Sequence, residues 1–526
     1  MRGSGSATTG SVATRPAPGD RIAAIDVGSN SIRLVVAEYD PEQGLTIIDE
    51  VRDQARLATG LASTGMLDEA TMDRAIEGLQ RMKEVVTRRG ARQLTAVATS
   101  AVREAGNGAA FVARVRKEAG IPLRIIDGET EAALSWRSVA HHFPLTKTRA
   151  LVADIGGGSL ELIGAVNGLI ETTASLPLGA VRMTERFPID ERGAVRAVRA
   201  IRKAARKKLK RAATWRAWSG AVVIGSGGTF TNLARMALER RGQVSTDAVH
   251  GEVVTAAEVE QLLEWLATRT LEERRNVPGL NPERADIILA GLAVTAELLD
   301  LAAAPAVRVS GFGLREGLLL EMVGGTTGPV ADPLRPLREF VERCQGDRRH
   351  VEQVRTLALS LYDQLGEGLG CGADERFLLE AAALLHDVGQ MVSYRQHHKH
   401  SYQLILHADR LNLSARDRSL VALISRYHRK RGPSRKHDEY MAMPEEERAV
   451  VRRLSGLLRV ADGLDRGHTS IVEKVRTRLM EHRLSVRVVP RLAGADVSLE
   501  CWGAERKADV LAALLERDVT VAPATI

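Results

Sequence analysis

Two aspartates of this chain each follow an apolar run and stand just before a glycine-rich turn. Asp26 precedes Gly28-Ser29-Asn30-Ser31, and Asp154 precedes Gly156-Gly157-Gly158-Ser159. Such turns can present backbone N–H groups and hydroxyls to an oxyanion, and the missing Cβ atoms let the backbone approach it closely. The pair indicates phosphate binding, although a single glycine turn is more often structural than functional.

A third turn, Gly225-Ser226-Gly227-Gly228-Thr229, lies between a predicted strand and a predicted helix. A helix N-terminus adds an anion site, because its first backbone N–H groups are unpaired and its dipole favours negative charge. Three such turns in one chain, two of them with an aspartate at the same offset, predict a site for phosphate groups.

The elements that position these turns are repeated along the chain. Residues 22–40 read IAAIDVGSNSIRLVVAEYD and residues 151–165 read LVADIGGGSLELIGA, each a strand, a turn and a second strand. The polar positions match as well as the apolar ones, as Asp26 and Asp154 show. The repeat implies a duplicated domain with two similar halves; chance similarity of two apolar hairpins is the alternative.

Helical runs and short apolar strands alternate around the two hairpins, which indicates an α/β fold. Beyond a predicted linker the pattern becomes helical, and near the end residues 484–489 and 496–501 alternate like strands. At 526 residues the chain is too long for one core. The predicted segments are a disordered tail at 1–20, two halves at 21–142 and 143–325, a helical domain at 333–470 and a small α+β piece at 471–526.

The composition excludes some classes of protein but does not identify the ligand. The net charge of +8 favours anionic partners but cannot separate nucleic acid, membrane surface and phosphate substrates. Three widely spaced cysteines make neither a disulfide framework nor a thiolate zinc site. No apolar run is long enough to span a membrane, and the N-terminus lacks the apolar centre of a signal peptide. We therefore expect a cytoplasmic protein.

Further segments follow the first hairpin in a recognisable order. They are AVATSAVREAGNG, IIDGETEAALSW, LVADIGGGSLELI, VIGSGGTFTNLA, and RADIILAGLAV with VSGFGLREGLL. Together they cover about residues 21–320 and resemble the exopolyphosphatase / guanosine pentaphosphate phosphohydrolase family, within the superfamily of actin, sugar kinases and chaperone ATPases. The resemblance implies an α/β fold of duplicated ribonuclease H-like (actin-like ATPase) halves.

The resemblance also assigns a catalytic role to Glu131, the general base for attack by water. We expect Glu131 in the first turn of a helix, where the helix N-terminus helps to keep a carboxylate ionised. The family usually has two glutamates here, whereas this chain has Thr130-Glu131, so only the second acid is retained. Arg103 matches a family arginine suited to bidentate phosphate contact; a surface arginine is the alternative.

The resemblance further implies a magnesium site. Asp154 and Glu161 would hold Mg²⁺ directly or through water, and Asp26 would assist from the opposite half. Magnesium commonly takes one or two carboxylates together with substrate phosphate.

A helix predicted over residues 191–213 carries a cationic stripe. Such a run is usually a solvated face, but a chain of phosphates needs a track for its remaining charges, which residues 426–436 could extend. The stripe consists of Arg196, Arg199, Lys203, Arg206, Lys207 and Lys210.

The C-terminal helical region resembles HD-type metal phosphohydrolase domains. His350, His386-Asp387 and Asp462 follow their H…HD…D order, and His400 and His428 are candidates for further ligands or phosphate contacts. Imidazoles with carboxylates suit a divalent transition metal better than Mg²⁺. A scaffold that keeps these residues without a metal is the alternative.

These patterns predict an exopolyphosphatase that releases terminal orthophosphate from inorganic polyphosphate. A guanosine pentaphosphate 5′-phosphohydrolase of the same fold is the main alternative. A kinase is disfavoured by the IIDGETEAAL segment, and a non-catalytic alarmone or polyphosphate sensor by the retained Glu131, Asp154 and Glu161. We expect a homodimer with no membrane and no specific nucleic-acid partner.

Overall fold

The computed structural model describes residues 16–41, 44–189, 194–242, 249–324, 334–372, 374–408 and 411–524. The chain forms two compact units, the first reaching residue 331 and the second beginning at residue 332. Most of the predicted tail and of the predicted linker lies outside the described residues. Among the described residues, no helix has both the length and the apolar character needed to cross a bilayer.

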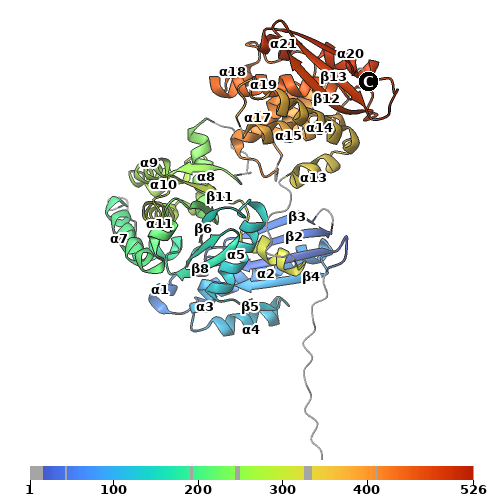
Figure 1. Ribbon diagram of the computed structural model, residues 1–526. Helices are drawn as coiled ribbons and strands as arrows, with labels where there is room; N and C mark the ends of the chain where they lie inside the picture. Colours follow the sequence, from blue (N-terminus) through green and yellow to red (C-terminus); the bar gives the residue numbers. More distant parts are fainter. Residues whose placement is uncertain are drawn as a thin grey trace, which may run out of the picture. The chain divides into compact units, whose positions relative to one another are not determined.

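The first sheet of the first unit has five strands in the order β3-β2-β1-β4-β5 (Figure 1). The first hairpin supplies β1 and β2, which pair antiparallel, and β4 and β5 continue the sheet in parallel to β1. The strands are β1 (Arg21–Val27), β2 (Ile32–Asp40), β3 (Gly44–Asp53), β4 (Gln93–Ala98) and β5 (Leu123–Ile125).

The second sheet repeats this arrangement. Its order is β10-β11-β9-β6-β7-β8, so the hairpin β6-β7 stands where β1-β2 stands in the first sheet, and β10 adds an antiparallel edge. The duplication predicted from the two hairpins is confirmed. The strands are β6 (Arg149–Ile155), β7 (Leu160–Val166), β8 (Leu169–Leu176), β9 (Val222–Ser226), β10 (Val253–Thr255) and β11 (Ala306–Val309).

Strand register fixes which side chains stand beside each aspartate. In the first hairpin Asp26 pairs with Arg33, and in the second Asp154 pairs with Glu161. Paired residues of an antiparallel ladder project from the same face of the sheet. The duplicated hairpins therefore present a carboxylate with an arginine in one half and two carboxylates in the other.

Two helices cross between the halves. α5 (Gly128–His142) packs Trp136 and Val139 on the second sheet, although it follows the last strand of the first. α12 (Leu314–Met322) comes from the end of the second half and packs Leu318 on the first sheet. The predicted boundary between residues 142 and 143 follows the order of the strands, whereas helix packing crosses it.

The remaining helices of the first unit pack around the two sheets and against one another. α7 buries an apolar edge that includes Ile201 and Leu209 and exposes Lys203, Lys207 and Lys210, as its 3.6-residue pattern predicts. α11 is buried along nearly its whole length. These helices are α1 (Leu61–Thr64), α2 (Glu69–Arg88), α3 (Ser100–Glu104), α4 (Gly108–Glu118), α6 (Ala180–Arg186), α7 (Ala194–Ala212), α8 (Gly228–Arg240), α9 (Ala256–Ala267), α10 (Leu271–Arg275) and α11 (Ile288–Leu301).

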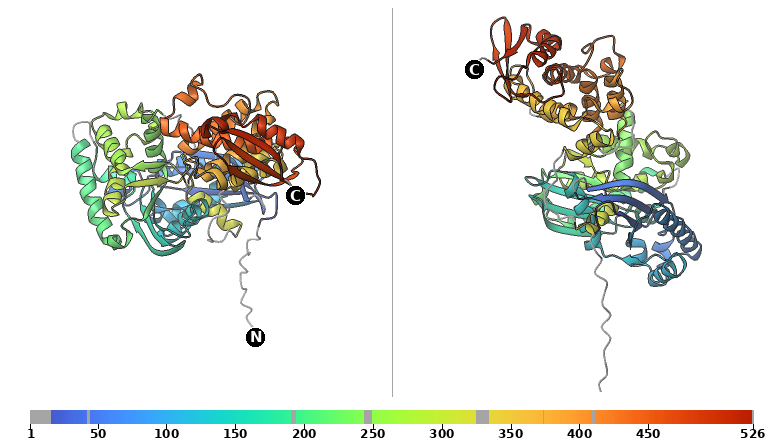
Figure 2. Two further views of the ribbon diagram at one scale, coloured as in Figure 1. Left: turned by 45° about the horizontal axis from the view of Figure 1, so that its top comes forward. Right: turned by 90° about the vertical axis from the view of Figure 1, so that its right-hand side faces the viewer.

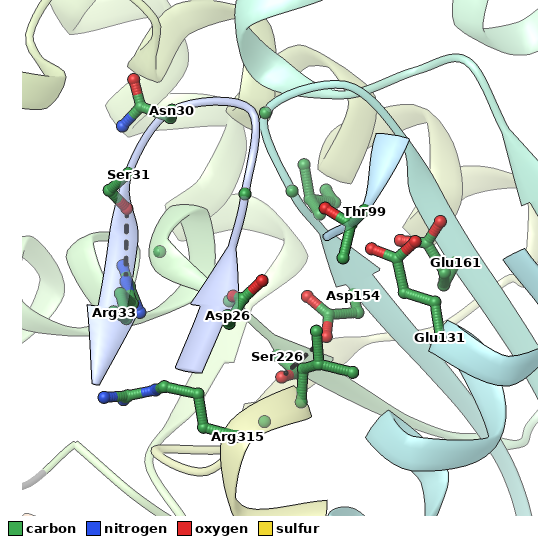
Figure 3. A pocket seen from close by; sticks show the side chains of 18 of the residues that line it. Asp26, Asn30, Ser31, Arg33, Thr99, Glu131, Asp154, Glu161, Ser226 and Arg315 are labelled. Carbon is green, nitrogen blue, oxygen red and sulfur yellow. Dashed lines mark hydrogen bonds between the residues drawn. The ribbon is translucent and has the colours of Figure 1, made fainter. Parts of the chain in front are cut away.

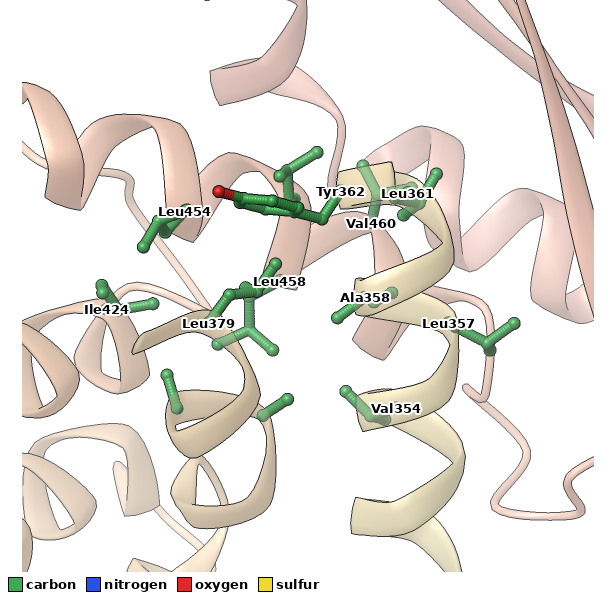
Figure 4. Packing of buried hydrophobic residues seen from close by; sticks show 14 of the residues in the cluster. Val354, Leu357, Ala358, Leu361, Tyr362, Leu379, Ile424, Leu454, Leu458 and Val460 are labelled. Carbon is green, nitrogen blue, oxygen red and sulfur yellow. The ribbon is translucent and has the colours of Figure 1, made fainter. Parts of the chain in front are cut away.

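The second unit is a helical bundle with a small sheet. Ala358 of α14 faces Leu379 of α15 and Leu458 of α19 in its core (Figure 4). Strands β12, β13 and β14 form a three-stranded sheet beside the helices (Figure 2). Its elements are α13 (Arg335–Arg343), α14 (Arg348–Leu365), α15 (Glu375–Leu385), α16 (His397–Leu406), α17 (Ala415–Arg426), α18 (Asp438–Met441), α19 (Glu445–Gly463), β12 (Val472–Leu479), β13 (Arg483–Pro490), α20 (Ser498–Arg506), α21 (Asp509–Leu515) and β14 (Asp518–Pro523).

The strand predicted at residues 496–501 is wrong, because α20 begins there. Val497, Cys501 and Ala504 are buried, which is the spacing of a helix face rather than of a strand. Asp496 accepts a hydrogen bond from the backbone N–H of Ser498 at 2.9 Å and so favours the turn that opens the helix.

Candidate functional site

The first two glycine turns meet in one cleft of the first unit. A Cβ on Gly157 would lie 2.9 Å from the Cβ of Ser29 and 3.1 Å from the backbone N of Asn30. Only glycine permits this approach, so the two turns pack directly against each other. Both turns line the cleft.

The third turn lines the cleft next to Asp154. Gly227 has φ 93°, and a Cβ there would lie 2.8 Å from Oδ1 of Asp154. Ser226 and Ser135 donate hydrogen bonds to Oδ2 of Asp154 at 3.4 and 2.8 Å. α8 begins at Gly228, so a helix N-terminus also opens onto the cleft. Gly225 lies in β9 and is not part of the lining.

Five carboxylates line this cleft, those of Asp26, Glu131, Asp154, Glu161 and Glu316, and Figure 3 shows the first four close together. Burial raises the pKa of Asp26 to about 6 and that of Glu161 to about 7. Burial also raises the pKa of Asp154, and it raises the pKa of Glu131 well above the usual range, with the charge of Glu161 adding to the effect. These carboxylates make one side of the cleft acidic, which is an environment that favours a bound cation.

Glu131 differs electrostatically from the sequence-based expectation. It lies in the first turn of α5, as predicted, but it is buried, and burial outweighs the helix N-terminus in setting its pKa. Arg103, predicted to contact phosphate, instead donates to Oε2 of Glu131 at 3.0 Å and to the carbonyl of Ile126 at 2.8 Å. Arg103 is not among the residues that line the cleft.

Three arginines that the sequence analysis did not single out also line the cleft: Arg33, Arg284 and Arg315. Arg33 and Arg315 lie beside Asp26 and lower its pKa against the effect of burial (Figure 3). The turn after β11 has the same strand–glycine–helix form as the third turn, and it places Arg315 at the start of α12. That signal was present in the segment VSGFGLREGLL.

The acidic side of the cleft fits a hard cation. Oδ1 of Asp26 is buried and has no hydrogen-bond partner among the described residues. Among the described residues, three potential metal-ligand atoms lie within 4.8 Å of one another only in the second unit. In the first unit a magnesium ion would therefore take one or two of these carboxylates and complete its shell with water and substrate oxygen.

In the second unit the structure brings together the four residues of the predicted H…HD…D pattern. Nε2 of His350 lies 3.7 Å from Oδ2 of Asp387 and 3.7 Å from Oδ1 of Asp462. One ligand atom each from His350, His386 and Asp462 lies within 4.8 Å of the other two. These residues come from α14, the end of α15 and α19, which the bundle places next to one another.

Hydrogen bonds at Nδ1 fix the orientation of two imidazoles in this cluster. Nδ1 of His350 lies 2.8 Å from Oδ2 of the buried Asp465, and Nδ1 of His386 lies 2.8 Å from the carbonyl of Ala383. Nε2 of both rings is buried and has no hydrogen-bond partner among the described residues. Fixing one ring nitrogen so that the other presents its lone pair is how proteins orient metal-binding histidines.

A second group of ligands shares Asp387. Oδ1 of Asp387 lies 3.1 Å from Nε2 of His397 and 3.5 Å from Nε2 of His428. Sequence reasoning named His428 only as a candidate and omitted His397, because nothing in the sequence places the start of α16 against this cluster. His400 belongs to none of the metal-competent groups among the described residues. Lys507 forms an ion pair with Oδ2 of Asp462.

Comparison with known proteins agrees with this architecture. The model of the Ppx/GppA phosphatase family matches residues 35–325, and that of Ppx/GppA phosphatase domain III matches residues 335–493. The chain is 28% identical over 411 residues to a guanosine-5′-triphosphate,3′-diphosphate pyrophosphatase of Vibrio vulnificus, covering 77% of this chain and 80% of the relative.

Two solved structures superpose on the chain. An exopolyphosphatase from Cytophaga hutchinsonii has a TM-score of 0.54 at 27% identity, covering 59% of this chain and 100% of the other. An exopolyphosphatase-like protein has a TM-score of 0.52 at 26% identity, covering 57% of this chain and 97% of the other.

Proposed function

Because the chain belongs to the Ppx/GppA phosphatase family and is a phosphohydrolase, we propose that its first unit is an exopolyphosphatase. It would release orthophosphate from the end of inorganic polyphosphate by Mg²⁺-dependent hydrolysis. The observation that carries the proposal is the cleft in which two facing glycine turns stand beside Glu131, Asp154 and Glu161.

Each part of the cleft has a role in this proposal. The glycine turns bind the oxygens of the terminal phosphate through backbone N–H groups, and Arg33, Arg284 and Arg315 supply positive charge. Glu131 accepts the proton of the attacking water; its raised pKa makes it a stronger base, and the ion pair with Arg103 favours the ionised form. Asp154 and Glu161, assisted by Asp26, would hold Mg²⁺, which supplies charge neutralisation at the phosphate when bound.

Guanosine pentaphosphate is the second candidate substrate, because the Vibrio vulnificus relative is named for an activity on that nucleotide. Phosphate release from long-chain polyphosphate and from guanosine pentaphosphate, with Mg²⁺ and with EDTA, separates the two. We expect faster release from polyphosphate and loss of both activities in EDTA. A clear preference for the nucleotide would overturn the polyphosphate assignment.

The Glu131→Gln variant tests the catalytic assignment. It keeps the shape of the side chain but removes the base, and we expect turnover to fall by about 10²–10⁴-fold with substrate binding retained. Glu129→Gln, at an exposed position of the same helical turn, is the matched control and should keep full activity. Equal activity in the two variants would exclude Glu131 as the base.

For the second unit we propose a divalent transition metal held by His350, His386, Asp387 and Asp462. The support is the pair of oriented imidazoles whose buried Nε2 atoms lack partners. Comparing the metal content of the full chain with that of the His386→Ala plus Asp387→Ala variant tests this proposal, and equal metal content would overturn it.

The predicted homodimer stays a prediction, which light scattering of the purified chain can test.

A further inference from the structure

A cavity of about 530 Å³ lies on the second unit between the start of α16 and the loop after α17. Its lining includes Arg395, Lys399, Arg429, Lys430 and Arg431, and no carboxylate is among the residues that line it. The volume falls in the range of about 300–1,000 Å³ that is typical of small-molecule sites.

Most of this charge is not compensated. Arg426, which also lines the cavity, pairs with Glu439 at 2.9 Å. For Lys399, Lys430 and Arg431, in contrast, no acidic side chain of the described residues lies within ion-pair distance. Burial, together with the cations around it, lowers the pKa of His398 to about 4. The cavity is therefore strongly positive.

A buried arginine fixes the loop that carries Arg429, Lys430 and Arg431. Arg459 donates from Nη1 to the carbonyl of Tyr427 at 2.9 Å and from Nη2 to the carbonyl of Lys430 at 3.0 Å. Asp509 holds the same guanidinium at 2.8 Å. Lys430 itself has φ 63°, a conformation that a non-glycine residue rarely adopts without such support. The backbone of this loop is thus held in place before any ligand binds, which lowers the entropic cost of binding.

The cavity also adjoins the histidine cluster of the second unit. Nη1 of Arg429 lies 3.2 Å from Nδ1 of His397, and Nε2 of the same ring faces Asp387. The guanidinium of Arg429 in turn stacks over the ring of Tyr394, 5.2 Å from its centre. An anion bound by Arg429 would therefore lie next to the cluster that we propose to hold a metal.

We propose that this cavity is a second phosphate site, which binds an oligophosphate anion, either inorganic or carried by a nucleoside. Its concave shape and fixed cations favour a small multiply charged ligand over a flat polyanionic surface. The site lies wholly within the second unit and does not depend on the function proposed for the first.

The experiment counts binding sites on the full chain. Titration with sodium tripolyphosphate in EDTA, where hydrolysis is blocked, should show two sites per chain. Lys399→Glu plus Arg431→Glu should weaken one site by about tenfold or more and leave the other unchanged. Arg435→Glu plus Lys436→Glu, in the same loop but outside the cavity, makes an equal change of charge and should keep both sites.

Failure of Lys399→Glu plus Arg431→Glu to weaken any site of the wild-type chain, or equal loss in the control variant, would overturn the proposal. A single wild-type site that this double variant weakens would support the proposal and would count against binding in the first unit. If the double variant misfolds, Lys399→Gln replaces it, because this change removes one charge without reversing it. Unchanged tripolyphosphate affinity of the second-unit site in Lys399→Gln would also contradict the proposal. Titration with GTP distinguishes the two sources, because only a nucleoside site should bind GTP more tightly than tripolyphosphate. Binding of an RNA oligonucleotide at this loop without tripolyphosphate binding would assign the surface to nucleic acid instead.

Discussion

Arg103 and Glu131 form an ion pair in which Nη1 of the arginine donates to Oε2 of the glutamate over 3.0 Å. The two side chains are largely buried, with 21% and 12% of their surfaces exposed. Burial and Glu161 raise the pKa of Glu131, whereas Arg103 lowers it. The arginine therefore sets how much of the proposed base is ionised near neutral pH.

Arg103→Gln should move the pH dependence of the enzyme. Without the guanidinium the pKa of Glu131 rises further, so the acidic limb of the kcat/KM profile should shift to higher pH. Activity at pH 7 should fall severalfold and recover in part at alkaline pH. Arg116→Gln, an exposed arginine of α4, is the control. A uniform loss at every pH would mean that Arg103 acts only by binding substrate.

Asp154→Asn and Glu161→Gln should each raise the Mg²⁺ concentration needed for half-maximal activity, by about tenfold or more. Each change removes one anionic oxygen from a site where magnesium has few carboxylates to use. Activity is measured across a Mg²⁺ titration. If the half-maximal concentration is unchanged in both variants, the second hairpin does not hold the metal.

The metal-free first unit should lose stability as pH rises from about 4.5 to about 7. Glu161 has its pKa raised from 4.5 to about 7 in the folded chain, so the folded state binds more protons than the unfolded state in this window. The free energy of unfolding therefore falls with increasing pH there. We expect Tm in EDTA to drop by a few degrees.

Glu161→Gln removes the titrating group and should flatten this slope, and saturating Mg²⁺ should flatten it in the wild-type protein. A slope that is the same in all three samples would show that Glu161 is not its cause.

The cationic stripe of α7 divides into two sets of residues. Arg206 pairs with Glu297 at 2.9 Å and with Asp300 at 2.5 Å, so it stabilises the packing of α7 on α11. Lys203, Lys207 and Lys210 are exposed. These lysines, together with the exposed Arg196 and Arg199, can follow the distal phosphates of a long substrate.

Changing the three lysines to Glu should raise KM for long-chain polyphosphate by about tenfold and leave guanosine pentaphosphate nearly unaffected. The long substrate loses ion contacts whose strength should also depend on salt, by analogy with nucleic acids. Arg116→Glu plus Lys117→Glu on α4 is the control for nonspecific charge effects. Equal effects on both substrates would exclude a track along α7.

Lys507→Met should raise the affinity of the second unit for Mn²⁺ by about tenfold. The ammonium group neutralises Asp462, which would otherwise be fully available as a ligand. Calorimetric titration of the metal-free chain measures the effect, with Lys474→Met as the control on an exposed strand. Unchanged or weaker Mn²⁺ binding would show that Lys507 does not compete with the metal.

Sequence reasoning succeeded where the signal was local. A strand, a glycine turn and an adjacent carboxylate lie within a few residues, so the hairpins around Asp26 and Asp154 were predictable, and so was their duplication. Local patterns also mislead, as in α20, where a short alternating run belongs to a helix.

Contacts between distant segments could not be predicted from these patterns. Arg315 reaches Asp26 only because α12 returns to the first sheet, and His397 meets Asp387 only because α16 packs against the end of α15. The burial that raises the pKa of Glu131 also depends on tertiary packing, so the helix N-terminus alone gave the wrong electrostatic expectation.

The exchange of α5 and α12 between the two sheets makes the duplicated halves mutually dependent. A fragment ending at residue 142 would lack Leu318 and its neighbours from α12 and would expose the apolar side of α5 that Trp136 occupies. The complementary fragment would have the opposite defects. Although the chain carries the repeat of an ancestral duplication, neither copy retains a complete core, and the first unit should unfold in one cooperative transition.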